Sequence, residues 1–72
     1  MTSISDQDKL RALLPHWIEH NAEHGAEFRN WADRARAAGL NEVAEELDMA
    51  AKQLSWVNGA LSDALHKLPL SA

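Results

Sequence analysis

Three of the four histidines of this chain lie at intervals of four residues, within the stretch HWIEHNAEH, residues 16–24. Residues four apart share one face of a helix, so His20 and His24 can direct two imidazole rings at one cation. A carboxylate one helical turn away would add an oxygen ligand, and such a set suits divalent first-row metals. The candidate metal ligands are therefore His16, His20, Glu23, His24 and Glu27.

The chain has no cysteine, which removes both disulfides and thiolate ligands. Any metal must then be held by nitrogen and oxygen atoms, and this donor set favours a divalent ion of the nickel, cobalt or zinc class. Iron, manganese and copper(II) also accept such ligands, so the identity of the metal stays open.

The composition points to one small acidic domain covering residues 1–72, with a net charge of -4. A chain of this size builds only a marginal core, so help from a ligand, a metal or a second copy is expected. The negative charge argues against nucleic acid as a partner. No apolar run approaches the roughly 20 residues that cross a bilayer, and the start MTSISDQDK does not resemble a signal peptide. We expect no membrane association and a cytoplasmic location.

Helix-forming residues dominate the chain and predict an all-α protein with two long helical arms. The first arm is expected over about residues 6–38, and Ser5 caps its start. Gly39 supplies the left-handed residue that ends it. The second arm is expected over about residues 41–68, capped by Asn41. The turn between the arms is short, so they should fold back as an antiparallel hairpin.

Pro15 interrupts the first arm, because proline lacks a backbone N–H and clashes with the carbonyl four residues back. We expect a kink there or a short extra N-terminal helix. One hairpin leaves an apolar strip on the outer side of the second arm uncovered, formed by Met49, Trp56 and Ala60. Two hairpins that pair as a homodimeric four-helix bundle would cover apolar surface of this kind. The alternative is a compact three-helix monomer, in which the segment around Leu10 covers the strip.

A polar layer is predicted to interrupt the apolar inward face. On the first arm that face carries Asn21 and His24 among the apolar residues Leu10, Leu13, Leu14, Trp17, Phe28 and Trp31. Folding about the turn places opposite each other residues whose numbers add to about 79. The resulting pairs are Asn21 with Asn58, His24 with Ser55 and His20 with Gly59.

Such polar groups should bond to each other, to water or to an ion, because each costs roughly 1 to 3 kcal/mol when buried and unsatisfied. Gly59 would leave room there for an imidazole ring or an ion. Alternatively, the two asparagines pair only to fix the register of the hairpin.

The stretch from residue 13 to residue 65 carries the pattern L-P-H-W-I-E-H-N-x-E-H, followed by W-A and a short glycine turn. It resembles a family of small all-helical domains that occur alone or fused to CooT-like nickel-binding accessory proteins, which are linked to carbon monoxide dehydrogenase maturation. The resemblance implies metal handling and a metalloenzyme maturation partner. The residues that carry the motif are His16, His20, Asn21, Glu23 and His24.

Two functions follow from these patterns. In the first, the protein is a metallochaperone-like hairpin that stores, senses or delivers a divalent transition metal through its histidines. In the second, it is a metal-free protein–protein interaction module that docks through Met49, Trp56 and Ala60. We expect no enzymatic activity, because a di-metal carboxylate enzyme needs inward-facing glutamates on several helices and the second arm offers none.

Overall fold

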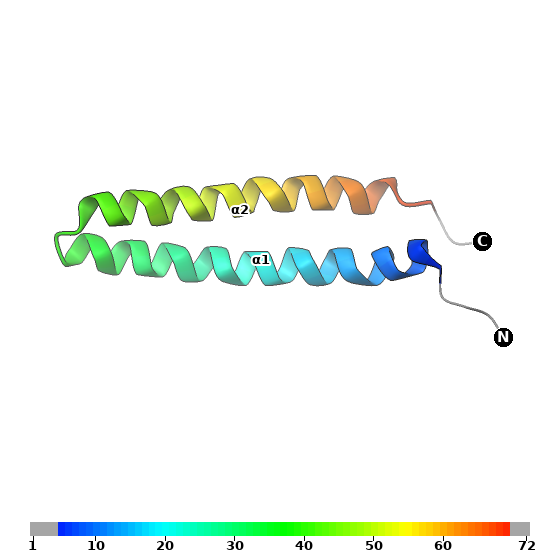
Figure 1. Cartoon of the computed structure of the whole chain (residues 1–72), viewed down its shortest axis with the longest axis horizontal. Coiled ribbons are helices and arrows are strands. Elements are labelled where there is room, and N and C mark those ends of the chain that lie inside the picture. Colours follow the sequence, from blue (N-terminus) through cyan, green and yellow to red (C-terminus); the bar gives the residue numbers. More distant parts are fainter. Residues whose placement is uncertain (1–4, 70–72) are drawn as a thin grey trace.

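The computed structural model describes residues 5–69, and these form two helices that lie side by side in opposite directions (Figure 1). Helix α1 spans Asp6–Ala37 and helix α2 spans Asn41–Lys67. The predicted all-α antiparallel hairpin is confirmed, and each helix end lies within one residue of the sequence prediction. Neither helix has a stretch apolar enough to cross a bilayer, as far as residues 5–69 go.

The connection between the helices is a Schellman turn. The N–H of Leu40 donates to the carbonyl of Ala35 at 2.8 Å, and that of Gly39 donates to the carbonyl of Arg36 at 3.0 Å. Gly39 adopts a φ of 80°, the left-handed geometry predicted for it. The prediction that Asn41 caps α2 is wrong, because Leu40 holds that position without a side-chain cap. Leu40 closes α1 and its carbonyl accepts the first hydrogen bond of α2, so the cap position falls on a residue whose apolar side chain cannot accept a hydrogen bond.

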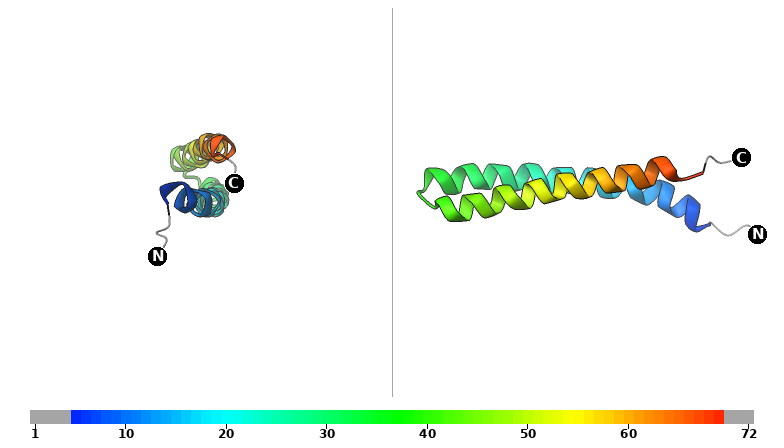
Figure 2. Two further views of the ribbon diagram at one scale, coloured as in Figure 1. Left: turned by 90° about the vertical axis from the view of Figure 1, so that its right-hand side faces the viewer. Right: turned by 90° about the horizontal axis from the view of Figure 1, so that it is seen from above.

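Helix α1 continues through Pro15 without a break. The short extra N-terminal helix predicted as one outcome is therefore not formed, and the N-terminal part of α1 bends instead, as the view from above shows (Figure 2, right). Pro15 is exposed, so the carbonyl that loses its helical donor lies where water reaches it, and the interruption costs less. A continuous helix cannot fold back, so the alternative of a compact three-helix monomer is wrong.

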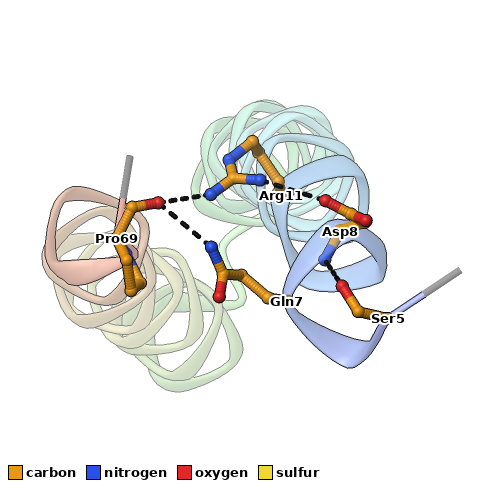
Figure 3. A network of polar contacts seen from close by, with 5 residues as sticks. All are labelled: Ser5, Gln7, Asp8, Arg11 and Pro69. Carbon is orange, nitrogen blue, oxygen red and sulfur yellow. Dashed lines mark hydrogen bonds and ion pairs between the residues drawn. The ribbon is translucent and has the colours of Figure 1, made fainter. Parts of the chain in front are cut away.

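The open end of the hairpin is tied by polar contacts across the two helices (Figure 3). The side chain of Ser5 accepts a hydrogen bond from the N–H of Asp8 at 3.1 Å, which confirms the predicted cap. Gln7 and Arg11 both donate to the carbonyl of Pro69, just beyond α2. Arg11 also pairs with Asp8 at 3.3 Å. These groups are solvated, so each pair contributes at most about 1 kcal/mol.

The helices meet through small side chains. The buried apolar side chains are Leu14, Ala32, Ala35, Ala44 and Ala51, and within residues 5–69 no large side chain is fully enclosed. The Cα positions extend 59 × 21 × 11 Å, so the molecule is two helices wide and one helix thick (Figure 2, left). Alanine lets the backbones approach closely but buries little apolar surface. The hairpin therefore has a contact line rather than a core.

The contact line has one specific polar contact at mid-length. The Nδ2 of Asn21 donates to the Oδ1 of Asn58 at 3.1 Å, and the Nδ2 of Asn58 donates to the carbonyl of Ile18 at 2.9 Å. Both asparagines are half-buried. The predicted pairing of Asn21 with Asn58 is confirmed, and each amide nitrogen has an acceptor within the chain.

We expect Gly39→Ala to lower the free energy of unfolding by about 1 to 2 kcal/mol, because alanine strains a left-handed backbone. The matched control is Gly59→Ala. Gly59 is helical, and an added Cβ there would meet nothing within 4 Å. Alanine should therefore raise the stability by up to about 1 kcal/mol. Urea unfolding at one protein concentration measures both values, and equal shifts of the same sign would contradict the assignment of the turn.

We expect Asn58→Leu to lower the free energy of unfolding by about 1 to 3 kcal/mol, because it leaves the Asn21 amide half-buried without its partner. The double variant Asn21→Leu with Asn58→Leu should recover most of that loss but give several species in amide NMR spectra, since the leucines no longer fix one register. Asn30→Leu, at an exposed position of α1, is the control. A double variant as homogeneous as the native chain would show that the asparagines do not set the register.

Candidate metal centre

Four aromatic rings form a ladder along α1, at intervals of four residues. The ring centroids of His16 and His20 lie 6.1 Å apart, those of His20 and His24 4.5 Å, and those of His24 and Phe28 6.0 Å. Four residues exceed one helical turn by about 40°, so the ladder slants round the helix. His16 and His20 are exposed, whereas His24 and Phe28 are half-buried. The burial follows the slant expected from the sequence.

The central pair of this ladder has the geometry of two ligands on one ion. The Nε2 atoms of His20 and His24 lie 3.1 Å apart, with the ring planes at 90°. Two nitrogens bound in neighbouring positions on an ion at 2.0–2.1 Å are separated by about 2.8 to 3.4 Å. Without an ion, the same separation is that of a hydrogen bond between one donor and one acceptor imidazole. An ion can therefore bind without a change in the separation of the two nitrogens, once both lone pairs turn toward it and both Nε2 atoms are unprotonated.

The carboxylates lie beside this pair rather than on it. A surface hollow of about 130 Å³ is lined by His16, Glu19, His20 and Glu23. Glu19 was not among the ligands predicted from the sequence, although its spacing of three residues from His16 and four from Glu23 places it beside the row. Glu27 is exposed and lies outside the hollow. Within residues 5–69, no three His, Asp or Glu side chains stand ready to hold a metal ion.

Gly59 does not face the histidines, and the prediction that it leaves room for an imidazole ring or an ion is wrong. It lines a hollow with Ser55, Trp56, Ala60 and Asp63. His20 precedes the facing residue Asn21, whereas Gly59 follows the facing residue Asn58. In an antiparallel pair, these positions turn to opposite faces of the hairpin. The predicted polar layer is thus reduced to the asparagine pair, and His20 and His24 lie toward one open face.

Comparison with known protein families matches residues 10–68 to the family described as Domain of unknown function (DUF8180). The chain belongs to the DUF8180 family. The match fits a small domain family, but its description names no sequence motif, no metal and no nickel-binding accessory protein. No curated protein and no solved structure matches the chain.

The DUF8180 region covers nearly the whole hairpin and includes all the candidate metal ligands, His16, His20, Glu23, His24 and Glu27. It also includes the asparagine pair that fixes how these residues are presented. In this DUF8180 hairpin the chemistry available to one chain is therefore a pair of imidazole nitrogens with acidic groups close by.

Proposed function

We propose that this protein binds a divalent transition metal, of the nickel, cobalt or zinc class, through the Nε2 atoms of His20 and His24. The observation that carries this proposal is the 3.1 Å separation of these two nitrogens, one helical turn apart. Two imidazoles from one helix form a chelate whose members are already on the same face before the ion arrives.

Each part of the ladder has a role in this proposal. The ring of His24 stacks against Phe28 and is half-buried, so its orientation is restricted. His20 is exposed and gives the ion access from water. Glu19 and Glu23 bring negative charge to the hollow beside His20, and they attract the cation before it binds.

The proposed role is storage, sensing or delivery of the metal, with a metalloenzyme under maturation as the expected recipient. Two ligands from one chain leave further coordination positions on the ion, which a recipient protein or a second copy can fill. We propose binding without catalysis, because a bundle enzyme of the di-metal type needs inward glutamates. No glutamate is buried among residues 5–69.

The outer strip of α2 favours a second candidate, the metal-free interaction module. Trp56 is 79% exposed and Met49 is 52% exposed, and both lie away from α1. Large apolar side chains left in water are typical of protein contact surfaces. A melting temperature that does not change when nickel, cobalt or zinc is added would favour this candidate over metal binding.

We expect isothermal titration of metal-stripped protein with nickel, cobalt and zinc to give a dissociation constant below about 100 μM for at least one ion, which is roughly -5.5 kcal/mol. His20→Ala and His24→Ala should each weaken binding tenfold or more, and the double variant should abolish it. His66→Ala, an exposed histidine near the end of α2, should bind as the native chain does. If no ion binds below that limit, or if the double variant binds normally, the proposal fails.

We expect the affinity to fall as the pH drops below about 6, because protons compete with the ion for both imidazole nitrogens. Titrations at pH 7.5, 6.0 and 5.0, in two buffers that differ in ionisation enthalpy, count the protons released. An affinity that stays constant to pH 5 would mean that carboxylates hold the ion.

A further inference from the structure

An uncovered seam runs along α1 at seven-residue intervals, formed by Leu10, Trp17, His24 and Trp31. Leu10 is 38%, Trp17 40% and Trp31 51% exposed. A seven-residue repeat of this kind is typical of a helix that packs against another helix. Helix α2 is not that partner, because it packs on the adjoining stripe that contains Leu14 and Ala32. The sequence predicted the seam on the inward face, and the structure leaves it on an open one.

Helix α2 extends the same open face. Val57 precedes the facing residue Asn58, just as His20 precedes Asn21, and in an antiparallel pair both positions turn to the same side. Val57 is 38% exposed, and Val43, two seven-residue repeats earlier on the same helix, is 50% exposed. The open face is therefore apolar on both helices, with His20 and His24 at its middle.

The chain exposes enough surface to form an interface of standard size and still resemble a compact protein of its combined mass. The accessible surface is 5715 Å², whereas a compact monomer of 8.0 kDa exposes about 4,500 Å². The surplus of roughly 1,200 Å² exceeds the 800 Å² or so that each partner buries in an interface of standard size. One hairpin laid on the open face would bury surface of this order.

A second copy of this chain fits the open face better than an unrelated partner does. His20 and His24 lie on either side of the middle of α1, which spans Asp6–Ala37. A two-fold axis perpendicular to the helices, with α1 packed against α1, brings the histidine pair of one copy level with that of the other. Trp17 and Trp31 are both seven residues from His24, so tryptophans then flank the histidines on both sides. No seam residue carries a permanent charge that would repel its own copy.

We propose that two chains pack through this open face and that the His20–His24 pairs of both copies together hold one metal ion at the interface. This inference rests on the proposed function. Each chain brings two nitrogens at the spacing of neighbouring ligands, and no third ligand stands ready among residues 5–69, so the second copy completes the site. Four imidazoles suit tetrahedral zinc or cobalt and planar nickel. The ion in turn compensates for the histidines within an apolar interface.

The arrangement differs from the bundle expected from the sequence. That bundle was predicted in order to cover Met49, Trp56 and Ala60. Trp56 lies two residues before the facing Asn58, about 200° round α2, so it points away from α1 and outside the proposed interface. The outer strip and the interface can therefore be tested separately.

The experiment is sedimentation velocity of metal-stripped protein with and without zinc, together with metal analysis of the isolated dimer. We expect one zinc per two chains and a dimer dissociation constant at least tenfold lower with zinc than without. Cobalt should give the intense visible bands of a tetrahedral ion. Trp17→Glu should abolish dimerisation and weaken zinc binding at least tenfold, while circular dichroism confirms that the helices remain.

Trp56→Glu is the matched control, since it places the same charge on the outer strip and should change neither dimerisation nor zinc binding. One zinc per monomer, with no dimer, overturns this inference and leaves the proposed function standing. Absence of zinc, nickel and cobalt binding overturns the proposed function and the shared site together. Loss of the dimer in Trp56→Glu but not in Trp17→Glu overturns the choice of face.

Discussion

The hydrogen bond between Asn21 and Asn58 is the contact on which the rest of this structure depends. The apolar contacts along the line, made by Leu14 and by alanines such as Ala32 and Ala51, are not directional. A shift along the contact line would separate the two amides and leave them half-buried without a partner. The amide pair therefore selects one register, and this register decides that the residue before Asn21, His20, lies toward the open face.

The thinness of the hairpin explains the distribution of its side chains. A molecule one helix thick cannot enclose large apolar groups, so Trp17 and Trp31 stay half-covered and Trp56 is almost free. The same geometry keeps the histidine row accessible to an ion from water. A thicker monomer would bury these rings and would then have to satisfy them internally.

Much of the fold could be predicted from single residues with a strong local effect. Ser5 and Gly39 mark helix ends through their own chemistry, and the asparagine pairing follows from counting back from the turn. Pro15 was predicted to kink α1 or to separate a short N-terminal helix, and α1 runs on through it with a bend and without the separate helix. The position of Gly59 was predicted wrongly, because counting residues from the turn gives the level of a residue along the hairpin but not the face of the hairpin on which it lies.

The candidate site was predictable only in part, for a related reason. Spacing alone places His20 and His24 on one side of a helix, but the 3.1 Å between their Nε2 atoms depends on side-chain rotamers. Rotamers also decide how closely the carboxylates of Glu19 and Glu23, which border the hollow beside His20, approach this pair. Sequence patterns do not specify such choices, because each acidic side chain has several staggered conformations open to it in water.

The tight turn at Gly39 has a consequence for how the chain assembles. Loop-closure entropy is smallest for residues near a turn, so the cluster of Ala35 and Ala44 can form before contacts farther from it. From there the two helices can associate turn by turn, from the Gly39 turn toward the open end of the hairpin. The ion pair between Arg36 and Asp48 is the first specific contact along this path, and the asparagine pair follows at mid-length. A chain that closes in the wrong register therefore mismatches its amides while half of the hairpin is still free to reopen.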